Sequence, residues 1–297
     1  MIKIAYINFW KDPYNDTYFD YFIKNNLNCN IIKVNYNENP DILISSVNGN
    51  INIIDNIKAK CKIFYYGENL DRYPPFNNIE LLKSKFDIIA GFKYTDKKEK
   101  IFRFPLWLIY YPFYNFNDKE NNIISFIENK YYNNIRKYKT LFGTLISRHD
   151  RGGQRIKIYN ILSNYYNIYC AGDFNNNTKK IGQTQKEKID YISNSIYNIC
   201  PENSIYEGYV TEKIFQAFEA GTIPLYWGHD LPEKEILNQN KYCFCNIDDN
   251  NILKQQIEDV VLNKDKYIIG SIFNDNAKNV IETYYNDLIN EIKKYIL

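Results

Sequence analysis

Short apolar runs alternate with polar or helix-patterned segments along most of the chain. In the first half, strands are expected at 2–9, 31–34, 41–44, 63–66 and 86–90, with a short helix at 18–25 and an apolar run at 103–111. Strands that alternate with helical patterns are typical of an open, mostly parallel sheet covered by helices. The pattern therefore predicts an α/β fold.

The same pattern resumes after a polar segment at 118–139, which we interpret as a helix followed by an interdomain linker. Two α/β units predict two doubly wound, Rossmann-like domains facing a cleft, with ligands beyond the carboxyl ends of the strands. The predicted division is 1–136, 137–280 and a C-terminal amphipathic helix at 281–297. In the second unit the expected strands are 141–146, 168–171, 196–199, 223–227 and 242–245, and the expected helices are 154–165, 186–195 and 252–262.

Composition narrows the class of protein. The chain has 297 residues, 45% of them hydrophobic, and a net charge of +2. This balance fits a globular protein and argues against nucleic-acid binding, which usually requires a basic surface. No apolar run is long enough for a transmembrane helix. The charged face of 281–297 mixes both signs, so docking onto the protein is favoured over peripheral membrane contact.

Cysteine usage points to a reducing compartment. Six cysteines are scattered along the chain beside only two histidines, and no C-x-x-C pair occurs. We therefore expect free thiols and no zinc site. The chain opens on a strand pattern without a signal-peptide pattern. A cytoplasmic location is expected, with contact at the inner membrane face as the other option.

The segment 200–228, CPENSIYEGYVTEKIFQAFEAGTIPLYWG, combines a turn-rich loop, a helix, a glycine turn and a short strand. A helix N-terminus carries unpaired N–H groups and a partial positive charge, which suit an anion. Lys213 adds a full charge there, and Glu212 adds a carboxylate suited to sugar hydroxyls. This combination predicts a nucleotide-sugar site. The alternative is an ordinary capped helix that leads into a buried strand.

This segment resembles the donor-binding signature of the bacterial α1,3/4-fucosyltransferase family, in which ENS or ENT precedes YVTEK and a small-residue turn into IPLYWG. The motifs YYGENL, FDIIAGF and FRFPLW are similar, in order, to the family's acceptor domain. The resemblance spans residues 60–250 and implies a glycosyltransferase-B fold, with the acceptor domain first and the GDP-fucose domain second. It also implies inverting transfer of L-fucose from GDP-β-L-fucose to an oligosaccharide hydroxyl, most simply α1,3 to GlcNAc or Glc of a lactosamine-like glycan.

Glu68 is the expected catalytic base, because a carboxylate directly after a strand lies at the edge where ligands bind. In the resemblance it matches the glutamate of the GEN motif. Asp71 is an alternative base, and a simple surface-turn glutamate is the alternative interpretation of Glu68.

Arg155 and Lys213 are the expected ligands of the diphosphate. The planar fork of an arginine suits phosphate, and Arg155 matches the family's order of strand, loop, arginine and helix. The loop 147–153, SRHDRGG, departs from the family pattern, so Arg148 and Arg151 remain alternatives.

Four further residues complete the predicted donor site. Asn203 and Glu212 resemble ligands of ribose or fucose hydroxyls, and Gly172 resembles the family's glycine turn near the nucleotide. Tyr209 either covers the sugar, contacts phosphate or simply packs. The cations replace a divalent ion in this interpretation, so no metal or other cofactor is expected.

Two other functions stay open at this point. The first is a transferase of the same fold that uses another nucleotide sugar, such as GDP-mannose. The second is a non-catalytic protein that binds glycans or nucleotides. GDP-fucose and an oligosaccharide acceptor, a lipid-linked or surface-polysaccharide precursor, are the expected partners.

Overall fold

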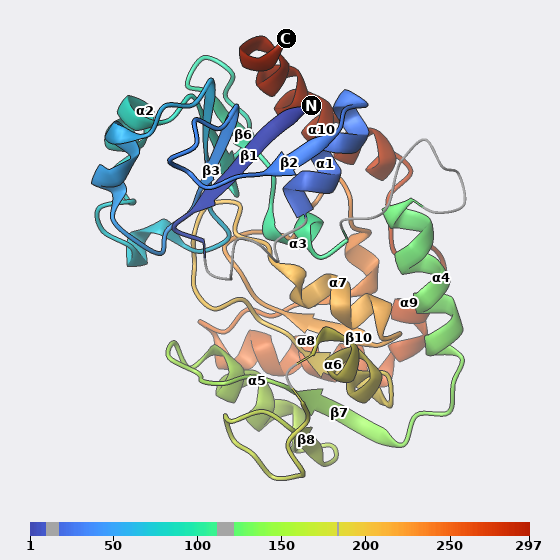
Figure 1. The fold of residues 1–297 in the computed structure, drawn as a ribbon. Coiled ribbons are helices and arrows are strands. Elements are labelled where there is room, and N and C mark those ends of the chain that lie inside the picture. The colour runs from blue at the N-terminus through green and yellow to red at the C-terminus, as the bar shows by residue number, and fades with distance from the viewer. Residues whose placement is uncertain (10–17, 112–121, 183) are drawn as a thin grey trace. The chain divides into compact units, whose positions relative to one another are not determined.

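The computed structural model describes residues 1–9, 18–111, 122–182 and 184–297, and these form two compact units (Figure 1). The first unit comprises Met1–Phe113, Tyr206–Tyr209 and Asn279–Leu297. The second comprises Tyr114–Ile205 and Val210–Lys278. The chain therefore leaves and re-enters the first unit.

The first unit contains a parallel sheet with the strand order β2-β1-β3-β4-β5-β6. Apolar side chains fill its strands on both faces, as expected for a sheet covered by helices. Its strands are β1 (Ile2–Ile7), β2 (Ile31–Lys33), β3 (Ile42–Ser45), β4 (Cys61–Tyr65), β5 (Ile88–Gly91) and β6 (Ile101–Arg103). Its helical elements are α1 (Tyr18–Leu27), η1 (Ile51–Asn56), η2 (Leu70–Arg72), α2 (Ile79–Lys85) and α3 (Leu106–Ile109).

The second unit contains a parallel sheet with the order β11-β10-β9-β7-β8. Counted along the chain, this is the doubly wound order 2-1-3-4-5, whose switch point lies between β7 and β9. The strands are β7 (Leu141–Leu145), β8 (Ile168–Cys170), β9 (Ser195–Ile199), β10 (Ile223–Tyr226) and β11 (Cys243–Phe244). The helical elements are α4 (Ile123–Ile135), α5 (Gln154–Leu162), α6 (Gln185–Ile192), α7 (Glu212–Glu219), η3 (Gln239–Lys241), α8 (Asn250–Leu262) and α9 (Lys264–Ile268).

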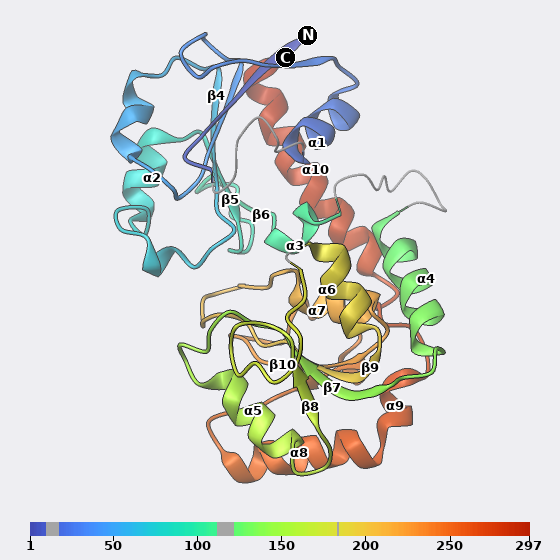
Figure 2. The same cartoon turned by 60° about the horizontal axis from the view of Figure 1, so that its bottom comes forward.

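Helices cover both faces of this second sheet (Figure 2). Ile158 of α5 and Ile257 of α8 join the core on one face, while α6 and α7 lie on the other. α7 packs against α4, where the amide of Asn134 donates to the carbonyl of Glu219 at 2.8 Å. Every strand predicted from the sequence is present, and the fold class is confirmed.

The C-terminal helix α10 (Ala277–Ile296) packs on the first unit. The Tyr285 ring packs edge-on against Phe22 of α1, with ring centroids 5.6 Å apart, and lies tilted against Phe104 at 5.5 Å. Leu288 and Ile289 of the same face are buried. The amphipathic pattern thus marks a docking face, as the sequence indicated. No helix in the described residues has the length and apolar character to span a membrane.

The two units differ in outline from the predicted division at 136 and 280. α4 belongs with the second unit because its apolar face packs on α7, and α10 belongs with the first. The apolar run at 103–111 contains the end of β6 and the short helix α3 rather than a single element.

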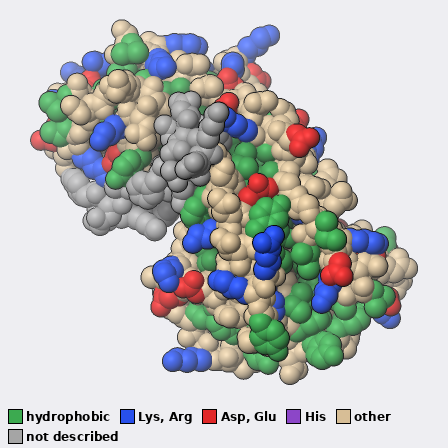
Figure 3. Space-filling view, turned by 90° about the vertical axis from the view of Figure 1, so that its right-hand side faces the viewer, with side chains coloured by type: hydrophobic (Ala, Val, Ile, Leu, Met, Phe, Trp, Pro, Cys, Tyr) green, Lys and Arg blue, Asp and Glu red, His purple; other side chains and the backbone are tan. Residues whose placement is uncertain are grey.

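The surface carries charges of both signs. On the face shown in Figure 3, Lys and Arg side chains are interspersed with Asp and Glu.

Replacing Leu288 with alanine tests whether α10 belongs to the core of the first unit. Leu288 is fully buried, so Leu288→Ala should lower the free energy of unfolding by about 2–5 kcal/mol. The exposed Asn290→Ala on the same helix is the matched control and should change it little. Urea denaturation measures both variants; equal stabilities would contradict the assignment.

Candidate functional site

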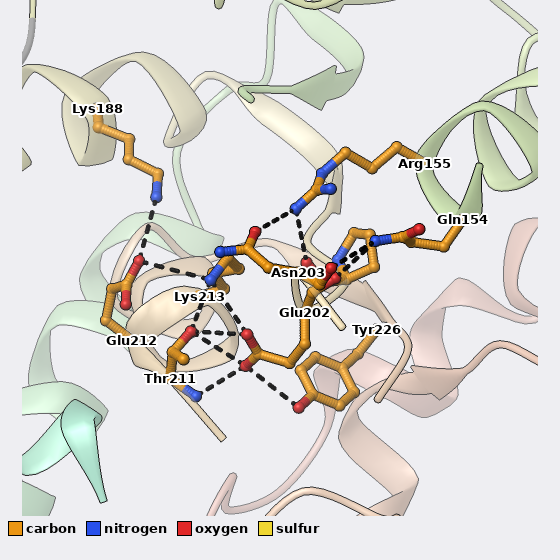
Figure 4. Close-up of polar contacts among 10 residues, drawn as sticks. Gln154, Arg155, Lys188, Glu202, Asn203, Thr211, Glu212, Lys213 and Tyr226 are labelled. Carbon is orange, nitrogen blue, oxygen red and sulfur yellow. Dashed lines mark hydrogen bonds and ion pairs between the residues drawn. The ribbon is translucent and has the colours of Figure 1, made fainter. Parts of the chain in front are cut away.

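Polar side chains converge at the switch point of the second sheet (Figure 4). Arg155 lies in the first turn of α5, the helix that follows β7 along the chain, and Asn203 follows the neighbouring strand β9. Nη2 of Arg155 donates to Oδ1 of Asn203 at 2.8 Å and to the carbonyl of Pro201 at 3.4 Å. The structure therefore brings together two residues that the sequence assigned separately to the donor.

Asp150 fixes the start of α5. Its carboxylate accepts the backbone N–H groups of Arg155 and Ile156 at 3.1 and 2.8 Å, and it lies 3.8 Å from Nη1 of Arg155. Arg155 is only 3% exposed as a result. Arg148 and Arg151, the alternative phosphate ligands, are exposed in the same loop. Among these three arginines, Arg155 is the one that is buried, and it lies at the switch point.

The carboxylate of Glu202 is the centre of the cluster and is fully buried. It accepts the backbone N–H of Thr211 at 2.7 Å and the Thr211 hydroxyl at 2.8 Å. It also accepts Nζ of Lys213 at 3.1 Å and the hydroxyl of Tyr226 at 3.3 Å. These contacts tie the loop after β9 to the first turn of α7. Glu202 therefore sets the shape of the loop that carries Asn203.

Lys213 lies in the first turn of α7 and stays charged. Its Nζ also donates to the Thr211 hydroxyl at 2.7 Å and lies 3.9 Å from Glu212. Burial alone would lower the pKa of Lys213, but the carboxylates of Glu202 and Glu212 outweigh burial and raise it. The Thr211 side chain makes no capping bond to α7, and the ammonium of Lys213 lies in the first turn, at the positive end of that helix.

Lys188 of α6 is a cation that the sequence analysis missed. Its Nζ lies 4.0 Å from Oε1 of Glu212, the oxygen that also faces Lys213. Burial lowers the pKa of Lys188 more than Glu212 raises it. Burial raises the pKa of Glu212, but Lys213 and Lys188 outweigh that effect and lower it. In the sequence, Lys188 belongs to a charged helix face and carries no local signal of this contact.

Gln154 is the second residue that sequence reasoning missed. Its side chain is buried, and its Nε2 donates to the carbonyl of Glu202 at 2.9 Å. Its Oε1 has no hydrogen-bond partner among the described residues. Only the fold reveals it, because a glutamine at the start of a helix is usually exposed.

Gly172 follows β8 and lies against the loop that follows β7. A Cβ at this position would lie 2.3 Å from the carbonyl oxygen of Ser147, which belongs to the backbone and cannot move away cheaply. The glycine therefore permits two strand-end loops to approach each other. A contact of Gly172 with the nucleotide stays a prediction.

The two remaining predicted residues belong to the first unit. Tyr209 is 3% exposed and packs edge-on against Phe92 with ring centroids 4.6 Å apart, which favours its packing role. Glu68 is half-buried directly beyond the carboxyl end of β4. The next residue, Asn69, accepts the N–H of Asp71 at 3.0 Å and caps η2. Glu68 thus lies at the sheet edge that the sequence predicted, and its role as base stays a prediction.

No cluster of metal-ligating side chains occurs in the described parts of the chain. All six cysteines are free thiols, and burial raises the pKa of Cys170 to about 11. The cations of the cluster are paired with Glu202, Glu212 and Asp150. A group that binds here must therefore compete with these carboxylates or share the cations with them.

Two family models match successive parts of the chain. The N-terminal domain of alpha-(1,3)-fucosyltransferase FucT matches residues 4–110, and the C-terminal domain of glycosyltransferase family 10 (fucosyltransferase) matches residues 135–269. The chain belongs to the family 10 fucosyltransferases. The second match contains Arg155, Asn203 and Lys213, so the polar cluster lies within the segment that matches this family's C-terminal domain.

Individual relatives agree with this assignment. The chain is 25% identical over 277 residues to alpha-(1,3)-fucosyltransferase FucT of Helicobacter pylori, covering 84% of this chain and 54% of that protein. It is 37% identical over 76 residues to 4-galactosyl-N-acetylglucosaminide 3-alpha-L-fucosyltransferase 9 of Bos taurus, covering 25% of this chain and 20% of that one. The chain thus spans about half the length of the Helicobacter pylori protein, and its match to the Bos taurus protein spans 20% of that protein.

Solved structures show the same fold. A crystal structure of an alpha1,3-fucosyltransferase covers 97% of this chain and 90% of its own, with a TM-score of 0.65 at 21% identity. A crystal structure of alpha1,3-fucosyltransferase with GDP-fucose has a TM-score of 0.62 at 20% identity and the same coverage. The two sheets of this family 10 member therefore have the glycosyltransferase-B architecture.

Removing the charge of Glu202 should destabilise the cluster. Glu202→Gln leaves the Lys213 side chain, which is only 16% exposed, without its closest carboxylate, so the free energy of unfolding should fall by about 3–5 kcal/mol. Lys186→Ala removes an exposed ion pair with Asp190 and should leave stability near that of the wild type. Denaturant titration of both variants checks this; a wild-type stability for Glu202→Gln would show that the pair does not hold the loop.

Proposed function

We propose that the chain is an inverting α1,3-fucosyltransferase that uses GDP-β-L-fucose. The observation that carries the proposal is the first turn of α7, where Glu202 and Glu212 keep Lys213 protonated beside the helix end. A protonated amine and aligned N–H groups suit a diphosphate leaving group. This turn lies inside the segment that matches the fucosyltransferase C-terminal domain.

In the proposed reaction, the carboxylate of Glu68 takes the proton of an acceptor hydroxyl while that oxygen attacks C1 of the fucose. The bond between C1 and the β-phosphate oxygen breaks, and its electron pair leaves with GDP. One displacement inverts the anomeric carbon, which gives the α-linked fucoside without a covalent intermediate. Lys213 and the start of α7 stabilise the negative charge that develops on the diphosphate.

The other donor residues have supporting roles in this proposal. Arg155, which hydrogen-bonds Asn203, is the second proposed ligand of the diphosphate. Asn203 and Glu212 are the proposed ligands of ribose or fucose hydroxyls. Cations within the protein neutralise the charge of the diphosphate, so the proposed reaction needs no divalent metal.

A lactosamine-like glycan is the proposed acceptor, and polysaccharide precursors are the proposed biological substrates. Free thiols, including the Cys243 and Cys245 sulfurs 3.8 Å apart, favour a reducing compartment such as the cytoplasm.

An assay with GDP-fucose and a panel of galactosylated acceptors tests the function, with the linkage determined by NMR. We expect α1,3 transfer, which EDTA leaves largely intact. Glu68→Gln should lower kcat by a factor of about 10²–10⁴ while GDP still binds, because the base acts only in the chemical step. Asp71→Asn is the control for the alternative base. Turnover with GDP-mannose alone would favour a different donor, and GDP binding without any turnover would favour a binding protein.

The lysines around Glu212 should differ in their effect on the donor. Lys213→Ala removes a charge-assisted bond to the diphosphate, so Kd for GDP should rise about tenfold to a hundredfold. Lys188→Ala removes a more distant cation and should raise it severalfold. Lys186→Ala is the matched control. Lys186 lies on the same helix as Lys188, and its side chain is 84% exposed, so its removal should not change the Kd for GDP. Calorimetric titration with GDP measures all three; unchanged affinity in Lys213→Ala would rule out this donor site.

A further inference from the structure

The loop that carries the donor residues is interrupted by a segment of the other unit. Asn203 lies before Tyr206–Tyr209 and Thr211 lies after it, and both belong to the second unit. Tyr206–Tyr209 itself packs within the first unit. Because consecutive Cα atoms are about 3.8 Å apart, a shift of this segment must move the residues on either side.

Arg103 holds this segment from the end of β6. It is 2% exposed, and its Nη1 and Nη2 each donate to the carbonyl of Gly208 at 3.3 Å. Nη1 also donates to the carbonyl of Phe92. The guanidinium lies 4.9 Å from the ring centroid of Tyr94 and 5.7 Å from that of Tyr284 in α10. An arginine fixed by carbonyls and aromatic faces has little freedom to move.

Gly208 fits this contact in two ways. Its φ is +67°, which favours glycine over other residues. A Cβ would lie 2.3 Å from the Phe92 carbonyl oxygen and 2.6 Å from Nη1 of Arg103. The backbone of the segment therefore comes so close to Arg103 that no side chain fits between them.

Aromatic contacts extend the attachment towards the loop of Glu68. Tyr209 packs on Phe92, and the Tyr206 ring lies edge-on to Tyr66 with centroids 6.4 Å apart. Tyr66 is buried directly after β4, and its hydroxyl accepts the N–H of Lys93 at 3.0 Å. The segment thus rests on residues that follow the carboxyl ends of β4, the strand before the proposed base, and of β5.

We propose that Arg103 and Gly208 form an anchor through which the first unit holds the donor loop in its binding conformation. Arg103 is then a positioning residue for the donor, acting through Tyr206–Tyr209 and touching neither substrate. With the anchor intact, Thr211 keeps its N–H on Glu202, and Lys213 keeps its place at the start of α7. This inference rests on the proposed function only where it concerns the donor.

The test uses two variants of the full chain, Arg103→Lys and Gly208→Ala. Arg103→Lys keeps the positive charge but loses the planar guanidinium that bonds Gly208 through two nitrogens. Gly270→Ala is the matched control, because its φ is +88° and its nearest neighbour lies 3.6 Å from the added Cβ. Hydrogen exchange followed by mass spectrometry reports on peptides covering 200–213. Both anchor variants should speed exchange of the Thr211 region about tenfold, while exchange in α8 and the Gly270→Ala protein stay as in the wild type.

GDP is the probe of the functional consequence. Kd for GDP and KM for GDP-fucose should rise together about tenfold in both anchor variants, with a smaller change in kcat. Tyr206→Ala, which leaves Arg103 and Gly208 in place and removes a half-buried ring, should shift exchange and affinity in the same direction by less.

Each arm can overturn the inference. Unchanged exchange at 200–213, or an equal change in Gly270→Ala, contradicts the anchor itself. Faster exchange with unchanged GDP affinity, or a fall in melting temperature with neither change, contradicts the positioning role. A wild-type protein that binds GDP without transferring fucose would instead refute the proposed function. The exchange and GDP-affinity results would still test whether Arg103 and Gly208 hold the loop.

Discussion

The buried carboxylate of Glu202 is the interaction on which the rest of the site depends. A buried charge is costly unless hydrogen bonds and an opposite charge surround it. Here Thr211, Lys213 and Tyr226 all turn towards it, from two different elements of the second unit. This arrangement fixes the loop after β9 and the start of α7 as one piece. The first turn of α7 is therefore held in place by contacts within the protein itself.

Preorganisation of this kind has a chemical value. Groups that stabilise developing charge are most effective when they need not reorganise during the reaction. Lys213 is held by two oxygen contacts, and Arg155 is held between Asp150 and Asn203. The carboxylates that orient these cations also limit their net charge. For the proposed diphosphate, this arrangement favours specific recognition over strong general attraction.

Much of the fold could be predicted because its strands are short apolar runs with turn residues between them. The start of α7 was also predictable, since Lys213 and Glu212 follow a turn-rich loop in a recognisable order. Lys188 and Gln154 could not be found in this way. They come from two separate helices that the fold brings to Glu212 and to the loop after β9, and periodicity carries no information about such contacts. Tyr209 shows the same limit, because the packing of its ring is set by Phe92 of another segment.

The path of the chain has a consequence for how this protein can be divided. Both ends of the chain lie in the first unit, so the second unit is an insertion within it. A fragment that stopped at Phe113 would lack α10 and would leave Phe22 and Phe104 without the ring of Tyr285. Cleaving the chain after Phe113 would therefore expose apolar surface on the N-terminal fragment. The first unit becomes complete only when the last helix has been synthesised.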